Sequence, residues 1–155
     1  MLMFLPFESR RGRHVVTTDP ARVDLDAAHA YLSRSYWAEA IPKALLAQAV
    51  ANSLCFALLA DDDRQLGLAR VITDGATFAY LCDVYVLEEA RGQGLGKWLI
   101  ESVMAHPDLQ GLRRFVLCTR DAHGLYAPFG FEPPKNPHVY MEIVRPDIYK
   151  TPIAG

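Results

Sequence analysis

The sequence predicts an α/β domain with a mixed sheet, and three observations lead to this fold class. Strand-like apolar runs in the first half follow one another across short turns, and the second half alternates helix-like and strand-like runs. A meander of strands followed by a βαβα order places antiparallel and parallel pairs in one sheet. The chain has 155 residues, of which 51% are hydrophobic and 22% charged, as expected for one globular domain spanning residues 1–155.

In the first third of the chain, a strand is followed by two helices. Asp24 is a plausible N-cap for the first helix, and Pro42 suits the first turn of the second. The segment between the two helices is aromatic and irregular. The expected ranges are a strand over His14–Thr18, a helix over Leu25–Ser33, the irregular segment Ser33–Ile41, and a helix running to about Asn52.

The middle of the chain predicts three strands in a meander. Residues 61–64 form the first hairpin turn, and Asp74-Gly75 forms the second. A helix should follow, because Leu95, Leu99 and Val103 fall on one stripe, and Pro107 should end it. The ranges are strands over Leu54–Ala60, Gln65–Thr73 and Thr77–Val86, a helix over Leu95–Ala105, a strand over Arg113–Cys118, a short helix over Ala122–Phe129, and a last strand over Val139–Val144.

The composition of the chain argues against two classes of binding partner. The net charge of −2 argues against nucleic acid or an anionic membrane surface, and we interpret the cluster Arg10, Arg11 and Arg13 as a solvated N-terminal segment. No apolar run is long enough to span a bilayer, and Met1–Phe7 is too short for a signal peptide. These features predict a cytoplasmic protein without a membrane or nucleic-acid partner.

The cysteines predict core packing and not a metal site. Cys55, Cys82 and Cys118 all lie in apolar strand-like runs, which is typical of buried free thiols in a reducing compartment. Cys118 is the nearest to the site proposed below, and a catalytic thiol there is the less favoured alternative. Cys and His show no metal-ligand spacing, so no metal is expected.

The most informative stretch is the glycine-rich turn at residues 91–96, Arg-Gly-Gln-Gly-Leu-Gly, between a predicted strand and a predicted helix. Glycines let the backbone approach a ligand closely, and a helix start presents free N–H groups and a partial positive charge. Arg91 adds a full positive charge. This combination favours binding of a phosphate or pyrophosphate.

Two common phosphate loops do not fit the spacing. A P-loop needs four residues between its first glycine and Gly-Lys, but only three separate Gly92 from Gly96-Lys97. The dinucleotide fingerprint needs Gly-x-Gly-x-x-Gly early in the chain, whereas these glycines alternate and lie past its middle. A nucleotide-binding function is therefore disfavoured.

The remaining pattern, Arg-x-x-Gly-x-Gly after a strand, resembles the pyrophosphate-binding signature of the GNAT superfamily of acyl-CoA-dependent N-acetyltransferases. Two further segments resemble the same family: the strand Asp83–Val86, and the run Leu125-Tyr126 followed by Gly130-Phe131. The resemblance implies a GNAT-like, mostly antiparallel sheet flanked by helices, and acetyl-CoA as cofactor. It also implies transfer of the acetyl group by direct attack of a primary amine of a small molecule or peptide.

The resemblance also implies which residues hold acetyl-CoA. The loop would bind the pyrophosphate mainly through backbone N–H groups, and the pantetheine arm would pair with the central strand. Thr119 stands where the family often has asparagine, so a hydroxyl would replace an amide there. The implied cofactor residues are Val84, Val86, Arg91, Gly92, Gln93, Gly94, Leu95, Gly96, Lys97 and Thr119.

Two residues are candidates for the chemistry. Tyr126 could protonate the leaving thiolate, since a phenol with a pKa of about 10 is close to a thiol at about 8.5; it could also be a packed aromatic. Asp83 lies in the middle of an apolar strand, where a carboxylate is costly unless it is used or paired. It could be the general base or the partner of an arginine, and His123 is a second, less favoured base.

The acceptor side is less defined. Tyr36 and Trp37 could enclose an acceptor, pack in the core or form a homodimer patch. Asp121 and His123 are further candidate acceptor contacts, as is Glu39. A non-catalytic acyl-CoA-binding module of the same fold is the alternative function.

Overall fold

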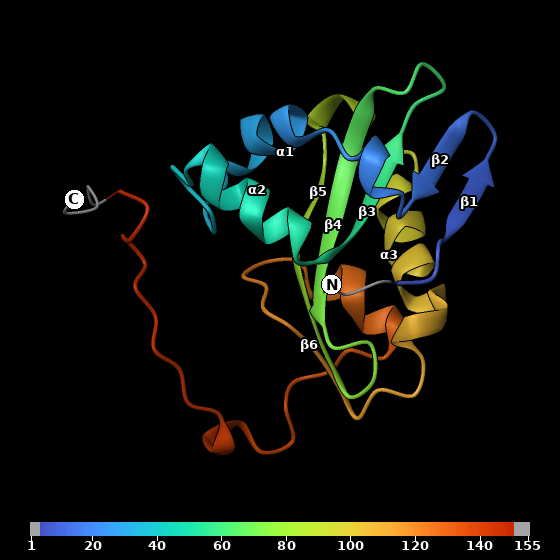
Figure 1. Ribbon diagram of the computed structural model, residues 1–155. Coiled ribbons are helices and arrows are strands. Elements are labelled where there is room, and N and C mark those ends of the chain that lie inside the picture. Colours follow the sequence, from blue (N-terminus) through green and yellow to red (C-terminus); the bar gives the residue numbers. More distant parts are fainter. Residues whose placement is uncertain (1–3, 151–155) are drawn as a thin grey trace.

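A computed structural model describes residues 4–150 and has helices on both faces of a six-stranded sheet (Figure 1). The strands lie in the sheet in the order of the sequence. All neighbours pair antiparallel except the last two, which are parallel. The fold is therefore the mixed, mostly antiparallel α/β arrangement that was predicted. The strands are β1 (Glu8–Arg11), β2 (His14–Thr17), β3 (Leu54–Leu59), β4 (Gln65–Thr73), β5 (Phe78–Val86) and β6 (Arg114–Leu117).

Helices α1 and α2 cover one face of the sheet, and α3 covers the other (Figure 1). Asp24 caps α1 as predicted, because its side chain accepts a hydrogen bond from the Ala27 N–H at 3.0 Å. The helices are α1 (Leu25–Leu32), α2 (Lys43–Ala51), α3 (Leu95–Ala105) and α4 (His123–Tyr126). Short 3₁₀ turns lie at Pro20–Arg22, Glu88–Ala90, Pro107–Leu109, Ala127–Phe129 and Pro137–Val139.

The central strands are buried on both faces. In β3 every residue is buried, with Leu54, Phe56 and Leu58 in the core beneath α3, and Cys55 in the core beneath α1 and α2. Alternation along a strand sends successive side chains to opposite faces, so covering both faces produces an unbroken apolar run. The two cores together hold the sheet rigid beneath the site.

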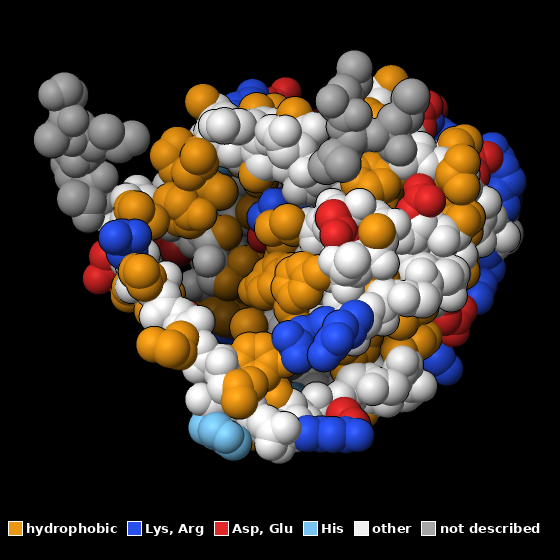
Figure 2. Space-filling view, turned by 60° about the horizontal axis from the view of Figure 1, so that its bottom comes forward, with side chains coloured by type: hydrophobic (Ala, Val, Ile, Leu, Met, Phe, Trp, Pro, Cys, Tyr) orange, Lys and Arg blue, Asp and Glu red, His pale blue; other side chains and the backbone are white. Residues whose placement is uncertain are grey.

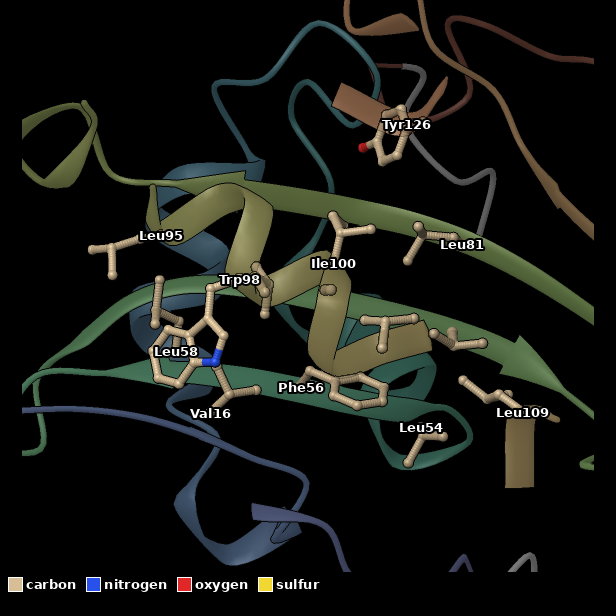
Figure 3. Packing of buried hydrophobic residues seen from close by; sticks show 14 of the residues in the cluster. Val16, Leu54, Phe56, Leu58, Leu81, Leu95, Trp98, Ile100, Leu109 and Tyr126 are labelled. Atoms are coloured by element: carbon tan, nitrogen blue, oxygen red, sulfur yellow. The ribbon is translucent and has the colours of Figure 1, made fainter. Parts of the chain in front are cut away.

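Helix α3 has the predicted bounds and the predicted buried stripe. Leu95, Leu99 and Val103 are all buried, and Trp98 and Ile100 extend the contact to the strands (Figure 3). The helix ends before Pro107, whose ring cannot continue it. This packing anchors the helix whose first turn carries the glycine-rich loop.

Two sequence expectations were wrong, and one strand was missed. Residues 8–11, where no strand was expected, form β1, which pairs with β2 in a hairpin. Arg10, Arg11 and Arg13 are exposed, in agreement with the interpretation of this cluster as solvated. Residues 139–144, expected as a last strand, pair with no other strand among the described residues and follow a 3₁₀ turn. Cys118, expected in the core, is exposed, whereas Cys55 is buried and Cys82 is half-buried.

A β-bulge interrupts β5 beside the candidate site. Leu68 pairs with Tyr85 and Arg70 pairs with Cys82, so two steps along β4 match three along β5. Asp83 is the extra residue of the bulge. Its φ of 51° is a left-handed conformation that Asp tolerates better than most residues. The bulge bends the last part of β5, which lies next to the end of its pairing with β6.

Candidate acyl-CoA site

The candidate site is a hollow between the separating ends of β5 and β6. The parallel pairing of the two strands ends at Leu81 and Leu117. Beyond that point, residues 82–86 and 117–122 line an opening of about 910 Å³. Figure 2 shows this side of the molecule hollowed, with hydrophobic side chains around the opening. The two strands therefore enclose a space long enough for an extended ligand to lie along β5.

The glycine-rich loop lies at one end of this hollow. Arg91 and Gly96 belong to its lining, while Gly92, Gln93 and Gly94 are exposed. Gly94 is the N-cap of α3 with a φ of 74°, and a Cβ built on it would meet no atom within 4 Å. The first hydrogen bond of α3 runs from the Trp98 N–H to the Gly94 C=O at 3.1 Å. The N–H groups of the residues just before Trp98 therefore have no acceptor within the helix. They can bind an anion.

Arg91 is oriented by two neutral groups. Its Nε donates to the Val86 C=O at 3.0 Å, and its Nη2 donates to the Tyr31 hydroxyl at 2.8 Å. Neither acceptor neutralises the guanidinium charge. Lys97 is exposed on the first turn of α3, whereas the Leu95 side chain is buried in the core, so Leu95 can offer a ligand only its backbone. The loop end of the hollow therefore offers an anion the Arg91 guanidinium, the Lys97 ammonium and backbone N–H groups.

The backbone of β5 has free groups on the side of the hollow. The Leu87 N–H donates to Leu66 of β4 at 2.7 Å, so its backbone faces β4. Alternation then turns the backbone groups of Val86 and Val84 away from β4, toward the space where β6 no longer pairs. Arg91 already occupies the Val86 C=O, which leaves the Val86 N–H. A ligand with amide groups can pair here as an additional strand edge.

Asp83 lies in the wall of the hollow, but both of its oxygens have partners. Its Oδ2 accepts from Arg70 Nε at 2.7 Å, and its Oδ1 accepts from Trp37 Nε1 at 3.0 Å. Arg70 also donates to the Ser53 hydroxyl at 3.1 Å. Only 8% of the Asp83 side chain and 15% of the Arg70 side chain are exposed. Of the two interpretations of Asp83, the pairing with an arginine is thus present in the structure.

Tyr126 lines the hollow from α4 and is buried. Burial raises the pKa of its phenol to about 12, so the group stays protonated over the range in which enzymes work. Its ring contacts Phe131 edge-on, with centroids 6.1 Å apart. Thr119 also lines the hollow, and its hydroxyl oxygen accepts from the Ala122 N–H at 3.0 Å. This bond shapes the loop that leads into α4.

Tyr36 and Trp37 form an aromatic wall of the hollow. Their rings meet edge-on at 5.0 Å, and the Arg120 guanidinium lies 3.8 Å over the Tyr36 ring. Asp121 is exposed at the rim beside Arg120. The structure therefore brings Tyr36, Trp37 and Asp121 to one opening. It leaves His123 exposed on the first residue of α4, outside the lining of the hollow.

Three residues in or beside the hollow were missed in the sequence analysis: Tyr31 and Arg34 line it, and Arg70 lies behind Asp83. Arg70 faces Asp83, Tyr31 orients Arg91, and Arg34 lies 4.4 Å over the Tyr31 ring. Arg34 also binds both oxygens of Glu88, at 2.8 and 3.1 Å, and this ion pair lowers the pKa of Glu88 to about 2. The sequence of β4 contained a signal for Arg70. A charged side chain there interrupts an apolar strand, and it therefore needs a partner.

Residues 4–150 contain no group of three His, Cys, Asp or Glu side chains arranged to hold a metal ion. Within the same range, no helix is both long and apolar enough to cross a bilayer.

Comparisons with known proteins agree with this fold. Residues 51–133 match the model of the acetyltransferase (GNAT) domain. A protein of Gibberella zeae named as an acetyltransferase is 38% identical over 138 residues, which cover 75% of this chain and 77% of the relative.

Solved structures agree as well. A GNAT-family structure from Xanthomonas campestris pv. campestris is 53% identical, with a TM-score of 0.87 over 89% of this chain and 97% of that one. A GNAT acetyltransferase of Elizabethkingia anophelis with acetyl-CoA bound shares the fold, with a TM-score of 0.60 and 15% identity over 79% and 78% of the chains. The family match covers both the bulged strand and the glycine-rich loop, and the chain accordingly belongs to the GNAT family of acetyltransferases.

Proposed function

We propose that the protein transfers an acetyl group from acetyl-CoA to a primary amine of a small molecule or peptide by direct attack. The observation that carries the proposal is the hollow between β5 and β6, with a glycine-rich helix start at one end and Tyr126 in its wall. The residues present fit the cofactor. The glycine-rich turn can bind the pyrophosphate. The free edge of β5 can pair with the amide groups of the pantetheine arm, and the apolar lining can surround the thioester.

Bound acetyl-CoA would supply the activated acetyl thioester. Backbone N–H groups of residues 92–97, with Arg91 and Lys97, would hold the pyrophosphate. The backbone of Val84 and Val86 would align the pantetheine arm, and Thr119 would contact it from the loop that follows β6. The Val86 N–H would also stabilise the negative charge that develops on the thioester oxygen during attack.

The chemical step needs one bond formed and one broken. The neutral amine nitrogen attacks the acetyl carbon, the carbon–sulfur bond breaks, and the amine releases a proton. The Tyr126 hydroxyl would donate a hydrogen bond, and in the limit its proton, to the departing thiolate. With a pKa of about 12, Tyr126 is a weaker acid than a free phenol, so stabilisation by a hydrogen bond is its main contribution.

Asp83 remains a candidate base within this proposal, directly or through water. Its two partners give a competing role, in which Asp83 holds Trp37 in the acceptor wall and fixes the bulge. Tyr36, Trp37 and Asp121 would contact the acceptor. His123 lies outside the lining of the hollow, which makes it the less favoured base.

A screen of amines tests the function. Amino acids, polyamines, aminoglycosides and peptide N-termini would be offered with acetyl-CoA, and release of free thiol would be followed. We expect turnover with at least one class, and product mass increased by one acetyl group. Binding of acetyl-CoA by calorimetry without turnover across the panel would instead support a non-catalytic acyl-CoA-binding module.

A further inference from the structure

The charged side chains that line the hollow leave no carboxylate without a partner among residues 4–150. The lining contains three arginines and two aspartates, Arg34, Arg91, Arg120, Asp83 and Asp121. Both oxygens of Asp83 already accept hydrogen bonds, and its side chain is only 8% exposed. Asp121 is paired with Arg120 at the rim. Each ammonium group of a bound polycation needs its own partner, so this lining disfavours polyamines and aminoglycosides as acceptors.

Aromatic side chains form much of the remaining lining, which includes Tyr36, Trp37, Tyr80 and Tyr126. Tyr36 is 48% exposed and Trp37 is 40% exposed, although both are large rings. The Trp37 indole is held in place, because its Nε1 donates to Asp83 Oδ1 at 3.0 Å and its ring meets Tyr36 edge-on. Fixed aromatic rings that stay open to a cavity favour a ligand with an apolar body.

Arg120 and Asp121 present opposite charges side by side at the rim. The Arg120 guanidinium lies 3.8 Å over the Tyr36 ring, and its backbone N–H donates to the Tyr36 hydroxyl oxygen at 3.3 Å. The contact between the Arg120 and Asp121 side chains, at 3.6 Å, is longer than a hydrogen bond, and the two are 65% and 66% exposed. Such an exposed ion pair contributes little to stability. A ligand that carries both a carboxylate and an ammonium group can therefore replace it.

The position of this pair along the chain relates it to the proposed cofactor. Arg120 directly follows Thr119, which would contact the pantetheine arm. A guanidinium binds a carboxylate through two parallel hydrogen bonds. In an α-amino acid the amine and the carboxylate are attached to the same carbon. A carboxylate bound to Arg120 therefore keeps the amine close to the arm that carries the thioester.

We propose that the acceptor is an α-amino acid with an aromatic or other large apolar side chain. This inference rests on the proposed acetyl transfer and names its acceptor. Arg120 binds the carboxylate, Asp121 attracts the ammonium group, and the apolar side chain lies against Tyr36 and Trp37. The ammonium group loses two protons in total, of which one goes to solvent and one ends on the thiol of CoA. The nitrogen forms a bond to the acetyl carbon as the carbon–sulfur bond breaks.

Three amines test the acceptor class with the full chain, by release of free thiol. Phenylalanine should be the best acceptor, phenethylamine should have a kcat/KM lower by about tenfold because it lacks the carboxylate, and spermidine should be the poorest. Arg120→Gln should raise the KM for phenylalanine about tenfold with little change in kcat, and should leave phenethylamine unaffected. Arg113→Gln is the matched control, since Arg113 is exposed and lies outside the lining. Preference for spermidine, or an equal loss with both aromatic amines in Arg120→Gln, would overturn the proposal.

Calorimetry on the protein saturated with CoA separates this inference from the proposed function. Phenylalanine should bind to the CoA complex, and Arg120→Gln should weaken this binding about tenfold, with circular dichroism checking that the variant is folded. Binding of phenylalanine without turnover of any amine would contradict acetyl transfer but support the ligand class. A lack of phenylalanine binding at millimolar concentration would overturn the inference, whereas turnover of other amines would still support the proposed function.

Discussion

Arg70 and Asp83 form a nearly buried ion pair across the bulge of β5, with Arg70 Nε 2.7 Å from Asp83 Oδ2. The pair sits where the register changes, since Arg70 faces Cys82 and Asp83 is the additional residue. The remaining oxygen of Asp83 accepts a hydrogen bond from Trp37. One carboxylate thus connects β4, β5 and the aromatic wall that contains Trp37, and the shape of the hollow depends on this single charge.

Loss of one partner should destabilise the fold more than loss of both. Asp83→Asn keeps a residue that tolerates a φ of 51°, but it leaves the Arg70 charge without its carboxylate. We expect a loss of about 3 kcal/mol in the free energy of unfolding for Asp83→Asn. Arg70→Met combined with Asp83→Asn should recover part of this loss. Urea unfolding of the wild type, both single variants and the double variant measures the coupling, and additive losses would contradict it.

The pH profile of the same variant separates two roles of Asp83. If the carboxylate removes the amine proton, Asp83→Asn should lower kcat most near neutral pH and less at high pH, where the amine is already neutral. If it holds Trp37 and the bulge, the loss should be equal at all pH values. Arg70→Gln is the matched control, because it keeps the carboxylate and removes its partner. A loss in Arg70→Gln as large as that in Asp83→Asn would favour positioning.

Local patterns were sufficient to predict most of the fold. Alternation, turn residues and the helical stripe placed β3, β4, β5 and α3, because each of these elements is buried against a continuous core. The strand expected at residues 139–144 shows the limit of this reasoning. Its composition favours a strand, but a strand also needs a hydrogen-bonding neighbour, and residues 4–150 place none beside it. Propensity alone could not reveal this.

The sequence predicts those parts of the site that depend on neighbouring residues in the chain. It does not predict the contacts that depend on how the strands pair. The loop at residues 91–96 was identified from the spacing of its glycines, because the glycines themselves permit the backbone conformation of the loop. The partner of Asp83 could not be found in this way, since the contact with Arg70 requires the register shift between β4 and β5. Asp83 itself was found because a carboxylate in an apolar strand needs an explanation. Tyr31 has no comparable signal, since it is one aromatic on an amphipathic helix.

Gly94→Val should weaken acetyl-CoA binding at least tenfold, about 1.4 kcal/mol. A side chain would obstruct close approach to the N–H groups, and a branched residue strains a φ of 74°. Gly111→Val is the matched control, because Gly111 has a φ of 70° and equally open surroundings but lies outside the loop. Calorimetry on both folded variants should show weaker binding only for Gly94→Val. Equal affinities would place the pyrophosphate elsewhere.

The Tyr126 phenol should resist deprotonation. Burial raises its pKa to about 12, so the folded chain keeps the proton between pH 10 and 12 while an unfolded tyrosine, at about 10, loses it. Its contribution to stability is therefore fully present below pH 10 and is lost as the pH rises toward 12. A difference spectrum of phenolate absorbance between wild type and Tyr126→Phe should show one group titrating above the free value. Titration near pH 10 would contradict the buried position.

Tyr126→Phe should lower kcat roughly 10–100-fold and leave acetyl-CoA affinity almost unchanged. The ring keeps its packing against Phe131, so only the donor to the thiolate is lost. The expected loss is at the low end for a general acid, because a thiolate leaves without much assistance and a phenol with a raised pKa transfers its proton reluctantly. Tyr140→Phe is the matched control, since it removes a hydroxyl from a residue that does not line the hollow. Single-turnover rates test this role, because chemistry and not product release limits them. An unchanged rate in Tyr126→Phe would show that Tyr126 is only a packed aromatic.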